Sequence, residues 1–387
     1  MRSLCLLTIL LSVTLATLNI SDDERHELSR DLTLWQKKFG HDDHVRAAMK
    51  LVRGTLTTDD LLRRLKATKD QLPTIRAANP HATFSHLTKF ALLTDSEFAR
   101  FVSGSASVVT PLPAAPASTN RSNRSATVSG NAYSVDWTTQ SICVPPVKFK
   151  GNCGSNWAIV AAAAVSSTHC LTTGDAINLS AQQVLGCSYP GGTDGCKGAG
   201  FAQHAMQWLV SHSDALCSES AIPYTSGETG LAPFCSDSTK CAGAFALQAG
   251  PIVNLRGEAA LTKQLQLQPV VAFVATPNHI WKSYRGGIVT WCPPTVYVDQ
   301  AMLVVGYGTH DAGFNNNTLL PFFKLRNTWG TNWGERGDIR ILRGEGNDEG
   351  ICKLAANLVY STLPPMGASK ATLPPMGASK ATLPHQP

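Results

Sequence analysis

Cysteine is the residue type whose number and spacing in this sequence most directly imply chemistry. There are 11 cysteines, and all except Cys5 lie between Cys143 and Cys352. Thiols can form disulfides or hold metal ions, but no ligand cluster with the spacing of a zinc site remains once ten cysteines are paired. We therefore predict up to five disulfides, no metal and no cofactor. The sequence alone does not fix the connectivity.

The N-terminus explains why these thiols would oxidise. Residues 1–16 read MRSLCLLTILLSVTLA, with Arg2 before an apolar run and small residues near Ala16. This pattern predicts a secretory signal peptide, which would remove Cys5, and the run is too short to span a bilayer. No second apolar run of about 18 residues follows, so we predict no membrane anchor. We expect the chain outside the cell or in a lysosomal or vacuolar lumen, where thiols pair.

The composition is globular and carries little charge bias. Hydrophobic residues make up 43% of the 387 residues, which is enough for a full core. The net charge of +6 comes without a dense run of Lys or Arg, so we expect no nucleic-acid partner. Five sequons mark expected surface glycosylation sites, at Asn19, Asn120, Asn123, Asn178 and Asn316.

Changes in composition divide the rest of the chain into four segments. Residues 20–102 are cysteine-free and charge-rich, and we predict a small helical domain. Residues 103–130 are rich in Ser, Ala and Pro and predict a solvated linker. Residues 131–361 hold the ten cysteines. Residues 362–387 contain the decapeptide TLPPMGASKA twice, which predicts a flexible, disordered tail.

Local patterns predict individual helices and strands. A helix should follow a capping box at Ser21 to Glu24, and a second should start at Thr57 and end or kink at Pro73. The first helix has apolar residues at helical spacing, namely Leu28, Leu32, Trp35 and Phe39. Residues 158–164 are Ala-rich and helical in pattern, whereas β-like runs occur at 269–274, 301–305 and 322–325. Helices followed by strands favour an α+β domain.

Six short blocks in residues 131–361 resemble, in order, those of the papain-like cysteine peptidases. They are Val135-Asp136-Trp137, Gly151-Asn152-Cys153-Gly154-Ser155-Asn156-Trp157-Ala158, Leu179-Ser180-Ala181-Gln182, Gly195-Cys196-Lys197-Gly198, Asp299-Gln300-Ala301 and Asn327-Thr328-Trp329-Gly330. Residues 88–94, with Arg64, Ile75 and Asn79, are similar to the inhibitory propeptide of cathepsin L-like members. The resemblance implies an α+β fold in which a helical lobe and a β-barrel-like lobe meet at a cleft, behind an N-terminal helical propeptide.

The resemblance also implies disulfide pairs. It joins Cys153 with Cys196, Cys292 with Cys352, and Cys187 with Cys235. Pairing Cys143 with Cys170 and Cys217 with Cys241 is then the remaining assignment that we adopt, although the sequence leaves the connectivity of these four open.

In this family a thiolate at a helix N-terminus attacks the peptide, a His moves the proton, an Asn orients the His and a Gln holds the oxyanion. The matching positions here are Asn156, Gln300, Asn327 and Lys150. A carboxamide does not ionise near neutral pH and is a poor nucleophile, so we predict a catalytically degenerate site with no functional catalytic residue. A lysine at the oxyanion position would favour a carboxylate.

Three functions remain open on this sequence. The first is a secreted pseudopeptidase that binds an extended peptide, a propeptide or a peptidase inhibitor in its cleft. This cleft would be lined by Gly154, Trp157, Gly198, Ala199, Asp299 and Trp329. The second is an active cysteine-type endopeptidase, through a compensating residue or a sequence error at positions 156 and 300. The third is a structural secreted glycoprotein in which the linker and tail matter. We expect a monomer in each case.

Overall fold

The computed structural model describes residues 20–50, 52, 54–103, 134–188, 195–198, 200–235, 241, 246–276, 278–293, 298–311, 319–344 and 348–364. The predicted signal peptide, nearly all of the linker and most of the repeat tail lie outside these ranges. The same is true of Ala199 and of four sequons, those at Asn19, Asn120, Asn123 and Asn316.

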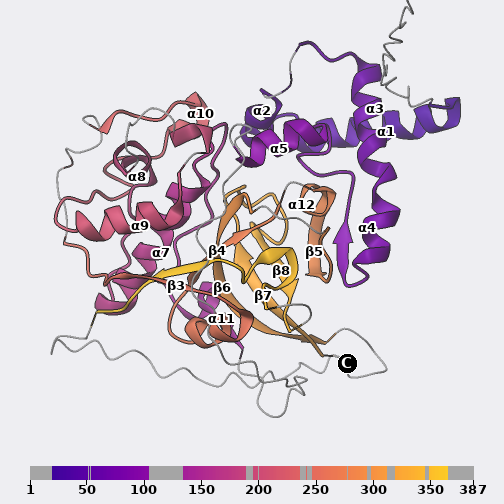
Figure 1. Ribbon diagram of the computed structural model, residues 1–387. Coiled ribbons are helices and arrows are strands. Elements are labelled where there is room, and N and C mark those ends of the chain that lie inside the picture. Colours follow the sequence, from indigo (N-terminus) through magenta and orange to yellow (C-terminus); the bar gives the residue numbers. More distant parts are fainter. Residues whose placement is uncertain are drawn as a thin grey trace, which may run out of the picture.

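Helices predominate in the first half of the described chain and strands in the second (Figure 1). The helices are α1 (Asp22–Phe39), α2 (Asp43–Met49), α3 (Thr58–Asp70), α4 (Leu72–Ala78), α5 (Asp95–Ser103), α6 (Trp137–Gln140), α7 (Asn156–Thr173), α8 (Ala181–Cys187), α9 (Ala202–Ser211), α10 (Ser226–Thr229), α11 (Glu258–Leu265) and α12 (His279–Ser283). The strands are β1 (Ala82–Phe84), β2 (Val135–Asp136), β3 (Ile252–Leu255), β4 (Val270–Val274), β5 (Tyr284–Val289), β6 (Gln300–Asp311), β7 (Leu319–Arg326), β8 (Asp338–Leu342) and β9 (Leu358–Ser361).

Helix α1 forms where the apolar spacing predicts it, and its four apolar residues are buried. Of the two hydrogen bonds of the capping box expected at its start, only one forms. The Ser21 hydroxyl accepts a hydrogen bond from the amide of Glu24 at 3.4 Å. The Glu24 carboxylate does not return to Ser21, because it pairs with Lys66 of α3 at 2.5 Å. A complete capping box stands instead at Thr57 and Asp60, before α3.

Helix α7 is buried along most of its length, as an Ala-rich sequence allows. Small side chains let α8, α9 and strand β6 approach it closely, and the helix ends at Gly174, whose φ of 84° few other residues adopt. In Figure 1 the helices α7, α8 and α9 lie on one side of the strands.

The strands form one sheet in the order β1-β5-β8-β7-β6-β4-β9-β3, with β2 paired to β6. Strand β4 is antiparallel to β6, with Val271 opposite Leu303. One face of these two strands packs with α7, α8 and α9, and the other face belongs to a second apolar cluster built around the remaining strands. Every residue of β4 is buried, because both of its faces are covered. The α+β architecture with two packed halves agrees with the expectation from the sequence.

Residues 20–103, here called the prosegment, do not pack only on themselves. Part of this segment has its own apolar core. Its strand β1 also pairs with β5, with Ala82 opposite Gly287. Three prosegment phenylalanines, at positions 90, 98 and 101, surround Trp329 with ring centroids 5.4–5.9 Å apart. The prosegment therefore shares the larger core with the strands, and its strand β1 lies beside β5 in Figure 1.

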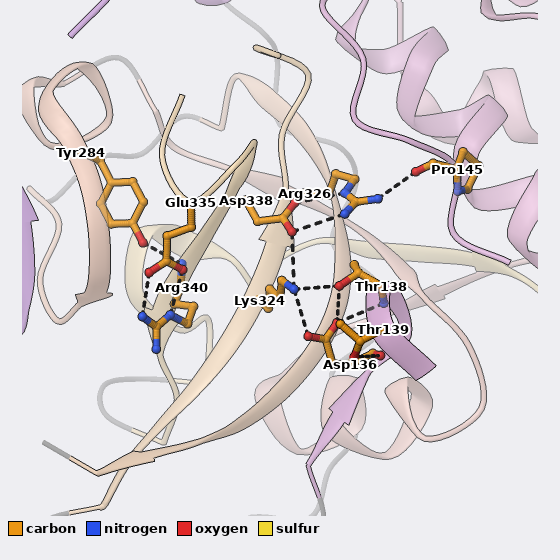
Figure 2. Close-up of polar contacts among 10 residues, drawn as sticks. All are labelled: Asp136, Thr138, Thr139, Pro145, Tyr284, Lys324, Arg326, Glu335, Asp338 and Arg340. Atoms are coloured by element: carbon orange, nitrogen blue, oxygen red, sulfur yellow. Dashed lines mark hydrogen bonds and ion pairs between the residues drawn. The ribbon is translucent and has the colours of Figure 1, made fainter. Parts of the chain in front are cut away.

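An ion-pair network fastens the chain where it re-enters the described fold after the linker (Figure 2). Lys324 of β7 reaches Asp136 at 2.9 Å and Asp338 at 3.5 Å. Arg326 binds Asp338 at 3.0 Å and also donates to the carbonyl oxygen of Pro145. The side chain of Asp338 is only 6% exposed, so this carboxylate is the buried centre of the network.

We expect Asp338→Asn to lower the free energy of unfolding by about 3 kcal/mol, because Arg326 would keep its largely buried charge without a counter-ion while Lys324 would retain only Asp136. Urea unfolding monitored by circular dichroism measures the change. Arg46→Gln removes an exposed pair with Asp43 and serves as the control, with an expected loss below about 1 kcal/mol. Equal losses in the two variants would contradict this account of the network.

Candidate active site

A tight loop precedes α7 and positions Asn156 as the first residue of this helix. Gly151 has a φ of +62°, and a Cβ there would lie 2.2 Å from the carbonyl oxygen of Gly227, so only glycine fits. The amide of Gly154 donates to the carbonyl oxygen of Cys196 at 2.6 Å, beside the Cys153–Cys196 disulfide. These contacts hold the loop rigidly against its neighbours and fix the position of the first residue of the helix.

Three carboxamides form a chain of hydrogen bonds across the junction of the two halves. Asn156 Nδ2 donates to Gln300 Oε1 at 2.9 Å. Gln300 Nε2 donates in turn to Asn327 Oδ1 at 2.9 Å. None of the three residues is more than 6% exposed. The structure thus brings together three of the four positions that the resemblance singles out, from the start of α7, the start of β6 and the residue after β7.

The middle carboxamide of this chain has a fixed direction. Gln300 uses its oxygen as an acceptor and its nitrogen as a donor, the same two functions that the ring nitrogens of a neutral imidazole offer. The amide N–H of Thr328 also donates to Asn327 Oδ1, at 2.7 Å, and so holds the third carboxamide. A carboxamide keeps its protons throughout, however, so Gln300 cannot take a proton from Asn156 or return one.

The two other potential nucleophiles near Asn156, Cys153 and Ser155, are already engaged in a disulfide and a hydrogen bond. Cys153 is in a disulfide. The Ser155 hydroxyl lies 2.5 Å from the hydroxyl of Tyr224, which binds the carbonyl oxygen of Lys150 at 2.8 Å. Burial raises the pKa of Tyr224 well above its usual value, so this phenol offers Ser155 no base. No free thiol remains among the described cysteines, because all ten are in disulfides.

Two titratable groups lie elsewhere around the site. The Asp299 carboxylate accepts from the amide of Thr276 at 2.8 Å, and burial raises its pKa to about 7. His279 begins α12 and faces the prosegment, with its Nε2 3.4 Å from Asp95. Burial lowers the pKa of His279. Neither group bonds to Asn156 in this structure.

Lys150 lies at the fourth predicted position and is 1% exposed. Its Nζ donates to the carbonyl oxygen of Phe101, in prosegment helix α5, and to that of Cys153 at 3.4 Å. The ammonium also lies 4.1 Å from the centroid of the Phe101 ring. Burial, the sole cause, lowers the pKa of Lys150 to about 7. The prosegment therefore covers this position in the intact chain.

Two more buried lysines hold the same interface, and sequence analysis missed both. Prosegment Lys89 donates to the carbonyl oxygen of Trp329 and to Asn332. Lys282 of α12 donates to the carbonyl oxygen of prosegment Leu93 at 2.5 Å. Burial lowers their pKa values to about 7 and about 8. The only sequence signal is a single Lys inside an apolar run, as in residues 87–93.

The remaining predicted cleft residues support the walls of the site. Trp329 is fully buried beneath the prosegment phenylalanines. Trp157 Nε1 donates to the carbonyl oxygen of Gly195 at 3.2 Å, and its ring fills the space where a Cβ on Gly200 would lie. Gly198 has a φ of +76°. The sequon at Asn178 is exposed, just before α8.

The structure joins the cysteines in the pairs expected above. They are Cys143–Cys170, Cys153–Cys196, Cys187–Cys235, Cys217–Cys241 and Cys292–Cys352. Among the described residues, no group of three or more His, Cys, Asp or Glu side chains could hold a metal ion.

Comparison with known proteins agrees with this architecture. Residues 132–362 match the papain family cysteine protease domain. Germination-specific cysteine protease 1 of Arabidopsis thaliana is 31% identical over 288 residues, which is 73% of this chain and 72% of the relative. The proform of the ragweed pollen allergen Amb a 11, a cysteine protease, superposes with a TM-score of 0.64 at 21% identity, covering 88% of this chain and 93% of that one.

A third comparison concerns an inhibitor complex. The bromelain protease of Ananas comosus bound to the inhibitor E64 superposes with a TM-score of 0.51 at 28% identity, covering 59% of this chain and 98% of that one. The two-lobe fold, the prosegment and the match over more than half of the sequence lead to one conclusion: the chain belongs to the papain family of cysteine proteases.

Proposed function

We propose that this member of the family has lost peptidase activity and binds extended peptides in the cleft between its two halves. The observation that carries the proposal is the hydrogen-bonded chain of Asn156, Gln300 and Asn327. Two carboxamides occupy the positions of the nucleophile and the base, and each satisfies the other. None of the three carboxamides in this hydrogen-bonded chain can ionise near neutral pH.

The expected loss of rate is very large. Covalent catalysis here would need a thiolate, whose pKa the start of a helix and a nearby imidazolium lower. Removal of the catalytic unit of a serine peptidase costs on the order of 10⁶ in turnover. Residual hydrolysis at Asn156 should therefore be close to the uncatalysed rate.

Peptide binding does not need the lost chemistry. The prosegment already occupies the region around Trp329 and Lys150, through aromatic contacts and lysine–carbonyl hydrogen bonds. An extended peptide can also pair with backbone groups, as near Gly198 and Ala199, because that contact depends on no particular side chain. The related bromelain protease was solved with the inhibitor E64, which supports a peptidase inhibitor as a further class of ligand.

The setting that we propose is the extracellular medium or a lysosomal or vacuolar lumen, with the chain monomeric and glycosylated. Five disulfides suit an oxidising compartment. Within the described ranges, no helix has the length and apolarity needed to cross a membrane.

The names of the relatives favour one alternative, that this chain is itself a peptidase. Assay of the whole chain, cut within residues 104–130 and with the prosegment displaced from the site, separates the two functions. We expect no cleavage of a fluorogenic peptide library between about pH 4 and about pH 8, with a thiol-directed inhibitor present to silence contaminants. A synthetic peptide of residues 85–101 with a C-terminal carboxamide should bind with a Kd below about 1 mM. Cleavage by the wild type, or no binding, would refute the proposal.

A further inference from the structure

The surroundings of Lys150 contain a mismatch of charge. The side chain is buried, yet both oxygens that it binds, on Phe101 and Cys153, are neutral carbonyls. Among the described residues, no carboxylate lies within ion-pair distance of its Nζ, and burial alone perturbs its titration. A buried ammonium normally has a counter-ion, because removing it from water is costly. The site therefore has an unmet preference for an anion.

The N-terminus of helix α7 lies in the same region and is a second source of positive charge. Ser155 occupies the N-cap position of the 18-residue helix α7 but makes no side-chain cap, because its hydroxyl is bound to Tyr224. The Nζ of Lys150 donates to the carbonyl oxygen of Cys153 at 3.4 Å, just before α7, which places the ammonium near the start of the helix. An uncapped helix start carries a partial positive charge and favours an anion. Lys150 supplies the full charge, and the helix end adds to it.

The group now seated on Lys150 shows which anion fits. It is a main-chain carbonyl, that of Phe101, and not a side chain. If a peptide ended at this point, its α-carboxylate would place an oxygen where the carbonyl oxygen lies and would add the missing negative charge. A side-chain carboxylate would require the peptide backbone to take a different position.

We propose that Lys150, with the uncapped start of α7, forms a binding site for the C-terminal α-carboxylate of a peptide held in the cleft. This inference rests on the proposed function and specifies its ligand: a peptide with a free C-terminus, of the kind that proteolysis elsewhere produces. The prosegment blocks the site with a neutral carbonyl and must move aside before such a peptide can enter.

The test uses the whole chain, cut within residues 104–130 with both pieces present, at about pH 6 so that the amine is protonated. Three synthetic peptides of residues 85–101 differ only at the C-terminal residue. One ends in the free carboxylate of Phe101, one in its carboxamide, and one in a carboxamide with Phe101→Glu. Fluorescence anisotropy measures each Kd. Because the prosegment competes equally with all three, the ratios of Kd do not depend on it.

The free carboxylate should bind at least about tenfold more tightly than the carboxamide, the difference between a charge-assisted and a neutral hydrogen bond. Lys150→Gln and Lys150→Met should reduce that ratio to about one. Lys282→Met should weaken both peptides and leave the ratio intact, because Lys282 contacts Leu93 at a distance from the C-terminus. Circular dichroism establishes that each variant is folded.

The other outcomes refute different claims. If the first two peptides bind equally, the carboxylate site is wrong although peptide binding stands. If the Phe101→Glu peptide binds most tightly, the site prefers a side-chain carboxylate and the proposed specificity for a C-terminus fails. If none of the peptides binds even when added in large excess over the prosegment, the proposed function fails together with the inference drawn from it.

Discussion

The paired substitution Asn156→Cys/Gln300→His is expected to create peptide hydrolysis in a chain for which we propose none. The supporting geometry is already present. Position 156 is the first residue of α7, where the helix end lowers the pKa of a thiol. Asn327 Oδ1 lies 2.9 Å from the nitrogen of Gln300, close to where an imidazole N–H would need its acceptor. We expect at least about 10³-fold more turnover than the wild type.

Lys150 should modulate the engineered activity. As a donor near the oxyanion position it can stabilise negative charge, but it has no role in moving the proton. The triple variant with Lys150→Gln should therefore remain active. Each single variant, Asn156→Cys or Gln300→His, should stay close to the wild-type background, because nucleophile and base act as a unit.

Hydrolysis of a fluorogenic peptide by the cut chain measures these differences, and titration with a thiol-directed inhibitor counts the active sites. The prosegment must be removed or outcompeted, since it covers Lys150. A paired variant that is folded, free of prosegment and still silent would show that the carboxamide network has reshaped the cleft as well as replacing its chemistry.

The prosegment should bind the remainder of the chain more tightly as the pH rises from about 7 to about 10. Burial at the interface lowers the pKa of Lys89 and Lys150 to about 7 and that of Lys282 to about 8. In the separated pieces these amines regain exposure and their usual pKa near 10.5. Protonation therefore favours separation, and the contribution to binding is lost as the pH falls and fully lost below about pH 7. Each lysine adds up to about tenfold in affinity per pH unit within this window.

The neighbouring charges shape this dependence. The charge of Asp42 opposes the lowering of the Lys89 pKa. His44 is also close enough to Lys89 for the two charges to interact. The pKa of Lys282 is raised by the charges of Asp95, which lies 3.8 Å away, and Glu97. The charge of Arg64 lowers it further. Burial lowers the pKa of His44 and His279, so both are mainly neutral above pH 7. The lysines therefore dominate between pH 7 and pH 10.

Dilution of the cut chain at a series of pH values, with the separation of a fluorescently labelled prosegment followed by anisotropy, measures the effect. Replacing all three lysines with Met should make the affinity nearly constant from about pH 7 to about pH 9. A wild-type affinity that is flat or falls across this window would show that the lysines remain charged in the complex.

Sequence patterns located the long, regular elements and the residues of the candidate site. The apolar spacing of α1 and the runs that became β4, β6 and β7 are set by burial, which leaves its period in the sequence. The positions of Asn156, Gln300 and Asn327 followed from their motifs. The sequence could not show that the three amides would bond in one direction, because that depends on the relative placement of three distant segments.

The elements that sequence analysis missed are those that depend on a neighbour. Strand β1 is three residues long and exists because it pairs with β5, whose own sequence contains two adjacent glycines. Helix α2 spans only seven residues, and Asp42 caps it while also contacting Asn332. The burial of Lys89 and Lys282 could not be predicted from the sequence for the same reason. Each of these lysines is buried by the contact between the prosegment and the rest of the chain.

Strand β1 also has a consequence for the behaviour of the chain in solution. It is the last strand on its side of the sheet, and β5 lies next to it. Departure of the prosegment would uncover the outer edge of β5 with its unpaired N–H and C=O groups, a template for strands of other molecules. The prosegment thus covers an edge that could pair with strands of other molecules, and we expect molecules that lose it to associate through β5 unless a peptide or partner takes the place of β1.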